Sequence, residues 1–290
     1  MTRTSFPPIL PIMLLACCVA AWASSQAFAQ SERVANTRRI EFEARMTETG
    51  PALENGVDWR IFGSKIAENG KLPLLSEAVG GVKEFDITPG EYLVHAAFGH
   101  AGAVRRIVVA DEDKPQVETF TLNAGALQLA GVTGTGSRVP GNLLRFDVYA
   151  KEADERGQRQ LIARNVKPNE IVPFPAGTYH VVSQYGRLNA EIRADLRVEA
   201  GKVTQAVIEH RAARMTFRLV KDSGGDAIAN TAWSILTESG DVITESSSAF
   251  PAFVLSEGAY TAIARNNEKI YSRDFRVISG VNEDIELLTE

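Results

Sequence analysis

One pattern recurs three times in this chain. An aromatic residue flanked by alternating apolar residues stands at Trp59, Phe146 and Trp233, at intervals of 87 residues. Downstream of each aromatic, a turn leads into Gly-x-Tyr and a further alternating segment. Markers in the same order at near-equal spacing indicate three tandem modules of one fold. The glycine and tyrosine pairs are Gly90/Tyr92, Gly177/Tyr179 and Gly258/Tyr260.

Apolar and polar residues alternate within each module, which is the period of a strand that buries one face. Val57/Trp59/Ile61 is one example, and turn formers such as Asn55-Gly56 and Ser239-Gly240 separate these runs. No amphipathic segment with helical spacing exceeds two turns. We therefore expect an all-β chain of three tandem antiparallel β-sandwich domains, each with about six or seven short strands.

The markers also predict the domain boundaries. The joints around Asn123-Ala124 and Arg211-Ala212 hold no long Pro/Gly/Ser linker, so adjacent modules are expected to touch. The predicted segments are a signal peptide at 1–29, a flexible lead-in at 30–38, and β-sandwich modules at 39–123, 124–212 and 213–290.

The first residues have the character of a secretory signal. Arg3 precedes an apolar run from Ile9 to Trp22, and Ala27-Phe28-Ala29 offers small residues for cleavage before Gln30. The run is shorter than the roughly 20 residues that span a bilayer as a helix. The pattern predicts a periplasmic or secreted protein with a cleaved signal peptide.

Cys17 and Cys18 are the two cysteines of the chain. Leu14-Leu15-Ala16-Cys17 loosely resembles a lipid-attachment sequence, but the apolar run continues past it and a better cleavage site follows. A lipoprotein is therefore the weaker alternative. A chain cleaved after Ala29 retains no cysteine, so each module would be held by its core without a disulfide.

The charge balance limits the classes of partner. The formal net charge is −5, and loss of Arg3 with the signal would make it −6. Acidic and basic residues are well mixed, without the basic cluster that tracks phosphates, so nucleic acid is not an expected partner. No second apolar stretch is long enough to span a bilayer, and we expect no transmembrane segment in the mature chain.

The repeated markers are expected to be structural residues. Trp59, Phe146 and Trp233 should lie at the centre of one sheet and face the other. The glycine of each Gly-x-Tyr should take the positive φ that other residues resist. The tyrosine two residues later, Tyr92, Tyr179 or Tyr260, should return its hydroxyl to a carbonyl of the turn, as in a tyrosine corner.

Catalytic constellations are missing from the sequence. There is no Gly-x-Ser-x-Gly, no Ser-x-x-Lys and no His-x-x-His, and the four histidines are expected at surfaces or edge strands. The glycine-rich Gly131–Gly136 lacks a following helix and is expected to be a loop. The acidic runs at 111–113 and 282–284 are expected to be solvated loops, with calcium binding as the alternative. We predict no enzyme activity, no catalytic residue, no cofactor and no metal.

Two aromatic–glycine turns are the candidate contact residues for a ligand or partner. Phe98 precedes Gly99, and Tyr185 precedes Gly186, in equivalent places of two modules. Their rings either pack against the neighbouring module or offer a stacking platform.

The third module resembles the carboxypeptidase regulatory-like, or transthyretin-like, β-sandwich domains of bacterial exported proteins, with an immunoglobulin-like assignment as the alternative. The resemblance rests on the strand–turn–strand segment from Val220 to Trp233, with Gly224-Gly225 in the turn, and on Phe253-x-Leu255-x-Glu257-Gly258-Ala259-Tyr260. The first and second modules carry Pro89-Gly90 and Ala176-Gly177 at the same place. The resemblance implies a non-catalytic accessory or adhesive domain and supplies no functional residue.

These observations predict an exported non-catalytic protein that binds an envelope protein or polysaccharide. A structural spacer in an envelope assembly is the alternative. A hydrolase with an unrecognised site is the third and weakest hypothesis.

Overall fold

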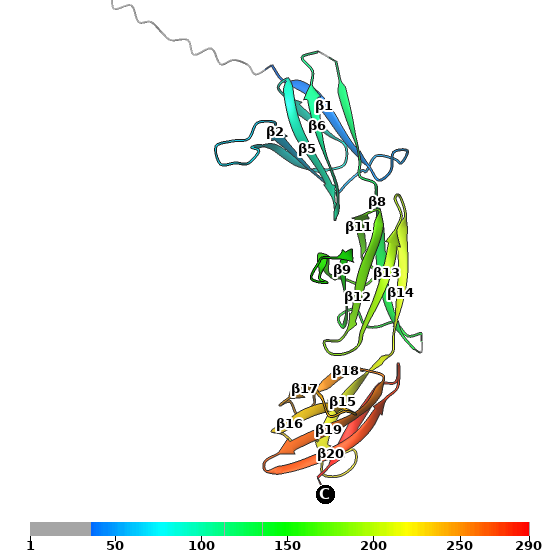
Figure 1. The fold of residues 1–290 in the computed structure, drawn as a ribbon. Coiled ribbons are helices and arrows are strands. Elements are labelled where there is room, and N and C mark those ends of the chain that lie inside the picture. Colours follow the sequence, from blue (N-terminus) through cyan, green and yellow to red (C-terminus); the bar gives the residue numbers. More distant parts are fainter. Residues whose placement is uncertain (1–35, 113, 135, 290) are drawn as a thin grey trace, which may run out of the picture. The chain divides into compact units, whose positions relative to one another are not determined.

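The computed structural model describes residues 36–112, 114–134 and 136–289 (Figure 1). The predicted signal peptide and residues 30–35 of the predicted lead-in lie outside the described residues. All regular structure in the described part is β-strand, numbered β1 to β21. No helix in the described part has the length and apolar character needed to cross a bilayer.

The first seven strands form one three-stranded sheet, ordered β4-β1-β7, and one four-stranded sheet, ordered β3-β2-β5-β6. Together they are the first module. The strands are β1 (Arg38–Arg45), β2 (Val57–Gly63), β3 (Leu74–Gly80), β4 (Lys83–Ile87), β5 (Gly90–Phe98), β6 (Ala101–Val109) and β7 (Gln116–Thr121).

The next seven strands repeat this arrangement as β11-β8-β14 and β10-β9-β12-β13, and form the second module. The strands are β8 (Ala124–Thr133), β9 (Leu144–Ala153), β10 (Arg159–Val166), β11 (Ile171–Pro175), β12 (Gly177–Tyr185), β13 (Glu191–Val198) and β14 (Val203–His210).

The last seven strands form the third module, with sheets β18-β15-β21 and β17-β16-β19-β20. The strands are β15 (Ala212–Val220), β16 (Thr231–Thr237), β17 (Val242–Ser246), β18 (Ala252–Ser256), β19 (Gly258–Asn266), β20 (Lys269–Val277) and β21 (Glu283–Leu288).

The prediction of an all-β chain with three tandem β-sandwich domains is confirmed. The word antiparallel needs one correction, because each module contains one parallel pair. The first strand runs parallel to the last in β1–β7, β8–β14 and β15–β21. The physical reason is that the other five strands of a module separate these two, so no tight turn forces them to reverse direction.

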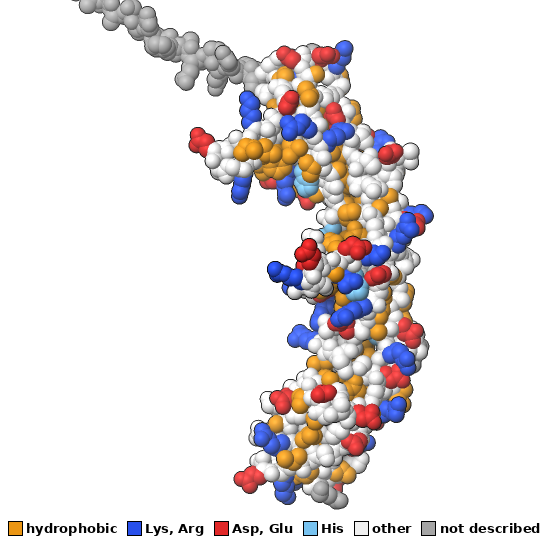
Figure 2. All heavy atoms as spheres, viewed as in Figure 1, with side chains coloured by type: hydrophobic (Ala, Val, Ile, Leu, Met, Phe, Trp, Pro, Cys, Tyr) orange, Lys and Arg blue, Asp and Glu red, His pale blue; other side chains and the backbone are white. Residues whose placement is uncertain are grey.

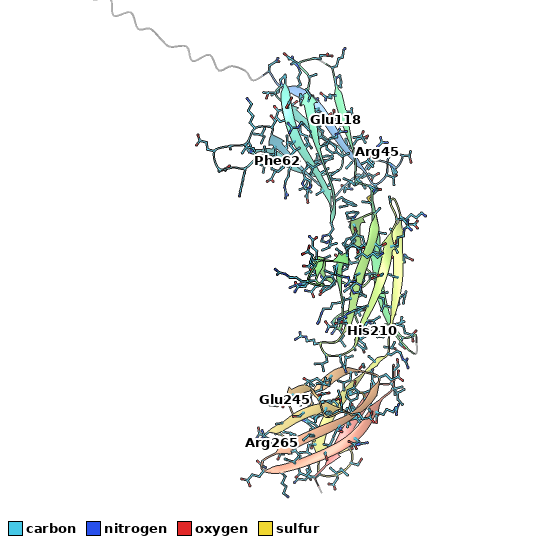
Figure 3. All side chains as sticks on the ribbon, in the orientation of Figure 1. Arg45, Phe62, Glu118, His210, Glu245 and Arg265 are labelled. Atoms are coloured by element: carbon cyan, nitrogen blue, oxygen red, sulfur yellow. The ribbon has the colours of Figure 1, made fainter. Side chains whose placement is uncertain are left out.

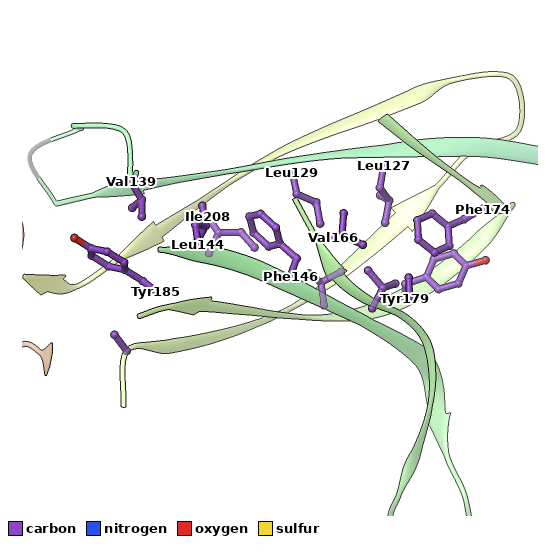
Figure 4. Packing of buried hydrophobic residues seen from close by; sticks show 14 of the residues in the cluster. Leu127, Leu129, Val139, Leu144, Phe146, Val166, Phe174, Tyr179, Tyr185 and Ile208 are labelled. Atoms are coloured by element: carbon purple, nitrogen blue, oxygen red, sulfur yellow. The ribbon is translucent and has the colours of Figure 1, made fainter. Parts of the chain in front are cut away.

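Each module has its own hydrophobic core between its two sheets. The inward residues of the strands alternate with exposed ones, as in β2, where Val57, Trp59 and Ile61 are buried between Asp58 and Arg60. Figure 4 shows the second core, where Phe146, Leu127 and Leu129 pack together from β9 and β8. Burial of one such side chain stabilises the fold by about 2–3 kcal/mol.

Candidate functional site

The three repeated aromatics lie in the cores. Trp59, Phe146 and Trp233 are at most 1% exposed and belong to β2, β9 and β16, which are interior strands of the four-stranded sheets. The Trp59 ring packs 5.5 Å from Phe42 and 5.4 Å from Phe120, measured between centroids. These side chains are placed to hold the sheets together and face no ligand.

Trp59 and Trp233 differ in one hydrogen bond. The Trp59 indole Nε1–H donates to the Gly81 carbonyl at 2.9 Å, in the short link between β3 and β4. The Trp233 indole Nε1–H is buried and has no hydrogen-bond partner among the described residues. The corresponding link of the third module, residues 247–251 between β17 and β18, is longer, and none of its carbonyls accepts a hydrogen bond from the Trp233 indole.

We expect Trp59→Phe to destabilise the chain more than Trp233→Phe. Both changes remove the same atoms, and phenylalanine already stands at the equivalent Phe146. Only Trp59→Phe leaves the buried Gly81 carbonyl without its donor, which costs about 1 kcal/mol beyond the change in packing. Urea unfolding of the two variants measures the difference, and equal losses would contradict the role of this hydrogen bond.

In each Gly-x-Tyr segment, the tyrosine side chain hydrogen-bonds back to the turn that precedes it. The hydroxyls of Tyr92, Tyr179 and Tyr260 donate to carbonyls four residues upstream, at 2.8, 2.8 and 3.0 Å. Gly90 has a positive φ of 155°, but Gly177 and Gly258 do not have one. The expectation of a positive φ is therefore wrong at Gly177 and Gly258, because these glycines begin strands β12 and β19, and the extended backbone of a strand has a negative φ.

Tyr179→Phe should lower the free energy of unfolding by about 0.5–1.5 kcal/mol, because the substitution removes only the hydroxyl that binds the Pro175 carbonyl. Tyr149→Phe is the matched control, since the Tyr149 hydroxyl makes no hydrogen bond to the described residues. Thermal unfolding of both variants tests this. An equal effect of the two changes would show that the hydrogen bond from Tyr179 to the Pro175 carbonyl does not stabilise the fold.

The Phe98 turn lies against the second module. Phe98 is half-buried and packs on the first core and over Gly56. Gly99 has a φ of 60°, and a Cβ there would come within 2.7 Å of Pro173. The next amide, that of His100, donates to the Pro173 carbonyl at 3.0 Å. This turn therefore has a packing role at the joint between β5 and β11.

The Tyr185 turn lies against the third module in the same way. The Tyr185 side chain is 3% exposed, and its ring packs edge-on to His210 at 5.8 Å. Gly186 has a φ of 78°, and a Cβ there would come within 2.7 Å of Val254 on β18. A ring this buried presents no open face for stacking, so its position favours packing. Ligand contact at Phe98 and Tyr185 stays a prediction.

A polar network joins the second and third modules. Asn189 donates through Nδ2 to the Tyr260 hydroxyl at 2.8 Å, and its Oδ1 accepts from the Ser256 amide at 3.0 Å. Arg211 binds Glu257 twice, through its guanidinium and through its backbone carbonyl, at 2.8 Å each. The third tyrosine turn is thereby held by the module before it.

His210 is a buried residue that the sequence did not identify. It lies on the edge strand β14, but its side chain is 1% exposed (Figure 3). Its Nε2 and the Ser183 hydroxyl share a hydrogen bond of 2.7 Å, and its Nδ1 has no partner among the described residues. Burial lowers the pKa of His210, because the charged ring would lose its hydration.

The His210 pKa predicts a loss of stability in acid. The unfolded chain takes up a proton at His210 as the pH falls below about 6.5, before the folded chain does. The contribution of neutral His210 is therefore fully present above pH 6.5 and is lost as the pH falls through the folded pKa. His210→Gln should flatten the fall in urea midpoint between pH 7.5 and 5.5; an unchanged slope would contradict this assignment.

The acidic runs bind partners within the protein, and the expectation of a loop is wrong at 283–284, because these residues pair with β15 as the start of β21. Asp111 pairs with Arg38 at 2.8 Å, and Asn282 accepts from the Arg214 amide at 2.8 Å. Asp113 is not among the described residues. In the described ranges, no three His, Cys, Asp or Glu side chains converge as a metal-binding group.

Residues 214–289 match the model of the Rhizobiales growth-associated tandem repeat domain. This stretch covers nearly all of β15–β21, the third module. With the repeated sheet order, this match defines the chain as a tandem repeat of β-sandwich modules. A comparison with curated proteins finds no match.

Several solved structures are similar at low identity. A streptococcal ancillary pilin is 10% identical over 88% of this chain and 99% of its own, with a TM-score of 0.30. GBS52, the minor pilin of Streptococcus agalactiae, is 13% identical over 60% and 95%, with a TM-score of 0.31. The Bacillus anthracis TIE protein is 16% identical over 88% of this chain, which spans half of that protein, with a TM-score of 0.24. The fold assignment rests on the strand order and pairing described above.

Proposed function

We propose that this chain is an exported, non-catalytic protein that binds an envelope protein or polysaccharide through its β-sandwich modules. The observation that carries the proposal is an apolar face on the first module, where exposed hydrophobic side chains are interspersed with charged ones. Exposed apolar surface that is rimmed by polar residues commonly marks a site of association. An apolar face favours a protein as the partner over a polysaccharide.

The face is the outer side of the sheet β3-β2-β5-β6. Val79 on β3 and Val104 and Val108 on β6 are each at least 60% exposed. Between these edge strands, Phe62 on β2 pairs in register with Leu93 on β5. Figure 2 shows hydrophobic side chains gathered on this part of the first module. The register places charged and polar residues among these side chains: Asp58 lies beside Val79, and His95 lies beside Val104, so the apolar surface is centred on Phe62 and Leu93.

Crosslinking of the tagged chain in its own cell envelope tests the proposal. We expect a discrete protein in the crosslinked product, and at least ten-fold less of it with Val104→Glu or Val79→Glu. Val207→Glu is the matched control, because Val207 is a 65% exposed valine on β14 of the second module. Equal recovery with all three variants would exclude this face as the binding surface.

A spacer role is the second candidate, and the tight joints favour it. Gly99 and Gly186 each lie against the following module without room for a side chain. If the chain is a spacer, replacing the first module with an unrelated β-sandwich of equal length should preserve function. If the apolar face binds a partner, that replacement should abolish function.

We further propose that the modules extend over 39–123, 124–212 and 213–290, that the signal peptide ends at Ala29, and that the modules are carboxypeptidase regulatory-like domains. The repeated sheet order supports the division into modules. Mass spectrometry of the exported protein, with Gln30 as its expected first residue, tests the cleavage site.

A further inference from the structure

The outer face of the four-stranded sheet in the third module contains a hollow of about 560 Å³. Its walls come from β16, β17, β19 and β20. The volume lies in the range of sites that hold small molecules, roughly 300–1,000 Å³. The lining residues that matter below are Ala232, Ser234, Glu245, Ile263, Arg265 and Ile270.

A comparison between modules explains why the hollow is open. In the second module the residue across from Gln184 is Arg145, whose guanidinium binds the Gln184 side chain and the Gly186 carbonyl. In the third module the corresponding cross-strand pair is Ala232 and Arg265. The methyl group of Ala232 is too short to cover the same space.

Two opposite charges face the hollow without an ionic partner. The Arg265 guanidinium makes no ion pair or hydrogen bond to the described residues. Glu245 accepts a hydrogen bond of 3.3 Å from the Ser234 hydroxyl and pairs with no cation in the described part of the chain. Figure 3 labels both charged residues on the third module. Elsewhere in this module Arg218 is held by Asp284 and Glu286.

The remaining lining is mixed, with Ala232, Ile263 and Ile270 aliphatic and Ser246 and Ser247 polar. Ile263 is half-buried and Ile270 is 69% exposed, and they lie on the neighbouring strands β19 and β20. The one aromatic residue in the lining, Trp233, has its ring in the core, so the hollow offers no exposed ring for stacking against a sugar. By the strand register, Ile263 lies across from Ser234, the partner of Glu245, whereas Ile270 lies across from Arg265 on the side away from Glu245. A cation and an anion with small aliphatic and hydroxyl side chains beside them suit a ligand that carries both charges and small side chains.

We propose that this hollow binds a short zwitterionic peptide. The ligand carboxylate binds Arg265, whose guanidinium presents paired donors to a carboxylate. The ligand ammonium binds Glu245, and its small apolar side chains contact Ala232 and Ile263. The hollow is on the third module, so this site does not depend on a partner at the apolar face of the first module.

Isothermal titration of residues 30–290 with trialanine tests the proposal. We expect a dissociation constant of about 1 mM or tighter for the peptide with free ends. Acetylation of its amine or amidation of its carboxylate should each weaken binding at least ten-fold. Equal affinity for the three peptides, or no binding of the free one, would overturn the proposal.

Three variants locate the site. Arg265→Gln should remove the preference for the free carboxylate, and Glu245→Gln the preference for the free amine. Ala232→Arg should fill the hollow as Arg145 does in the second module and abolish binding. Arg276→Gln, an arginine on the neighbouring strand β20 outside the hollow, should bind like the original chain. Unchanged binding by folded Ala232→Arg would exclude this hollow, and circular dichroism checks that each variant is folded.

Discussion

Trp59→Ala should destabilise the first module by about 3–5 kcal/mol. The indole is fully buried and contacts Phe42 and Phe120, so its removal leaves a cavity between the two sheets. The Gly81 carbonyl also loses its donor. A loss of this size is a large share of the 5–15 kcal/mol that typically stabilises a domain.

Hydrogen exchange resolved along the chain is the measurement for Trp59→Ala, because it reports the loss of protection separately for each module. Protection should fall across β1–β7 and persist in β15–β21. Val104→Ala on β6, where the side chain is 60% exposed, should stay within about 0.5 kcal/mol. Unchanged protection in the first module of Trp59→Ala would refute the central role of the indole.

Gly125→Ala is the second change with a large expected effect. A Cβ at Gly125 would lie 2.1 Å from the Glu199 carbonyl oxygen and 2.8 Å from that of Lys202. Both are backbone atoms, held by the hydrogen bonds from Ala126 to Lys202 and from Gly201 to Ala124. Because no side chain can simply rotate away, we expect a cost of about 1–3 kcal/mol or more.

Gly177→Ala is the control for Gly125→Ala. A Cβ at Gly177 would meet only the Tyr179 ring, at 4.0 Å, and the backbone φ there is not positive. Alanine is favoured over glycine in a strand by about 0.5–1 kcal/mol, so this change should be neutral or stabilising. Urea unfolding of both variants compares their free energies of unfolding. Equal effects would show that the backbone near Glu199 moves to accept the methyl group at little energetic cost.

The fold class was predictable from sequence because a strand's alternation is local information. Apolar and polar residues alternate around each buried aromatic, so the apolar face of β2 or β16 can be identified without knowing the tertiary contacts. The parallel pairing of β1 with β7 was not predictable in this way. It depends on where the chain returns after five further strands, and no spacing in the sequence encodes that return.

The predictions of site residues were limited for the same reason, because the contacts that decide them join residues far apart in the sequence. Tyr185 stands at the end of β12, where the sequence suggests an exposed ring. In the structure the ring packs against His210, and the next residue, Gly186, packs against Val254; both partners come from more distant parts of the chain. The Ser183–His210 pair joins two strands 27 residues apart. The hollow of the third module arises from the absence of a long side chain at Ala232, which is visible only after the strands are in register.

The parallel pairing has a mechanical consequence. A first strand and a last strand that run side by side in one direction place the two ends of a module at opposite ends of this ladder. A pulling force between those ends therefore loads the ladder along the strands, so its hydrogen bonds must break together rather than one after another. The longest such ladder joins β8 to β14, from Ala126 beside Val203 to Thr133 beside His210. Under tension, each module should resist extension until it yields abruptly as a unit.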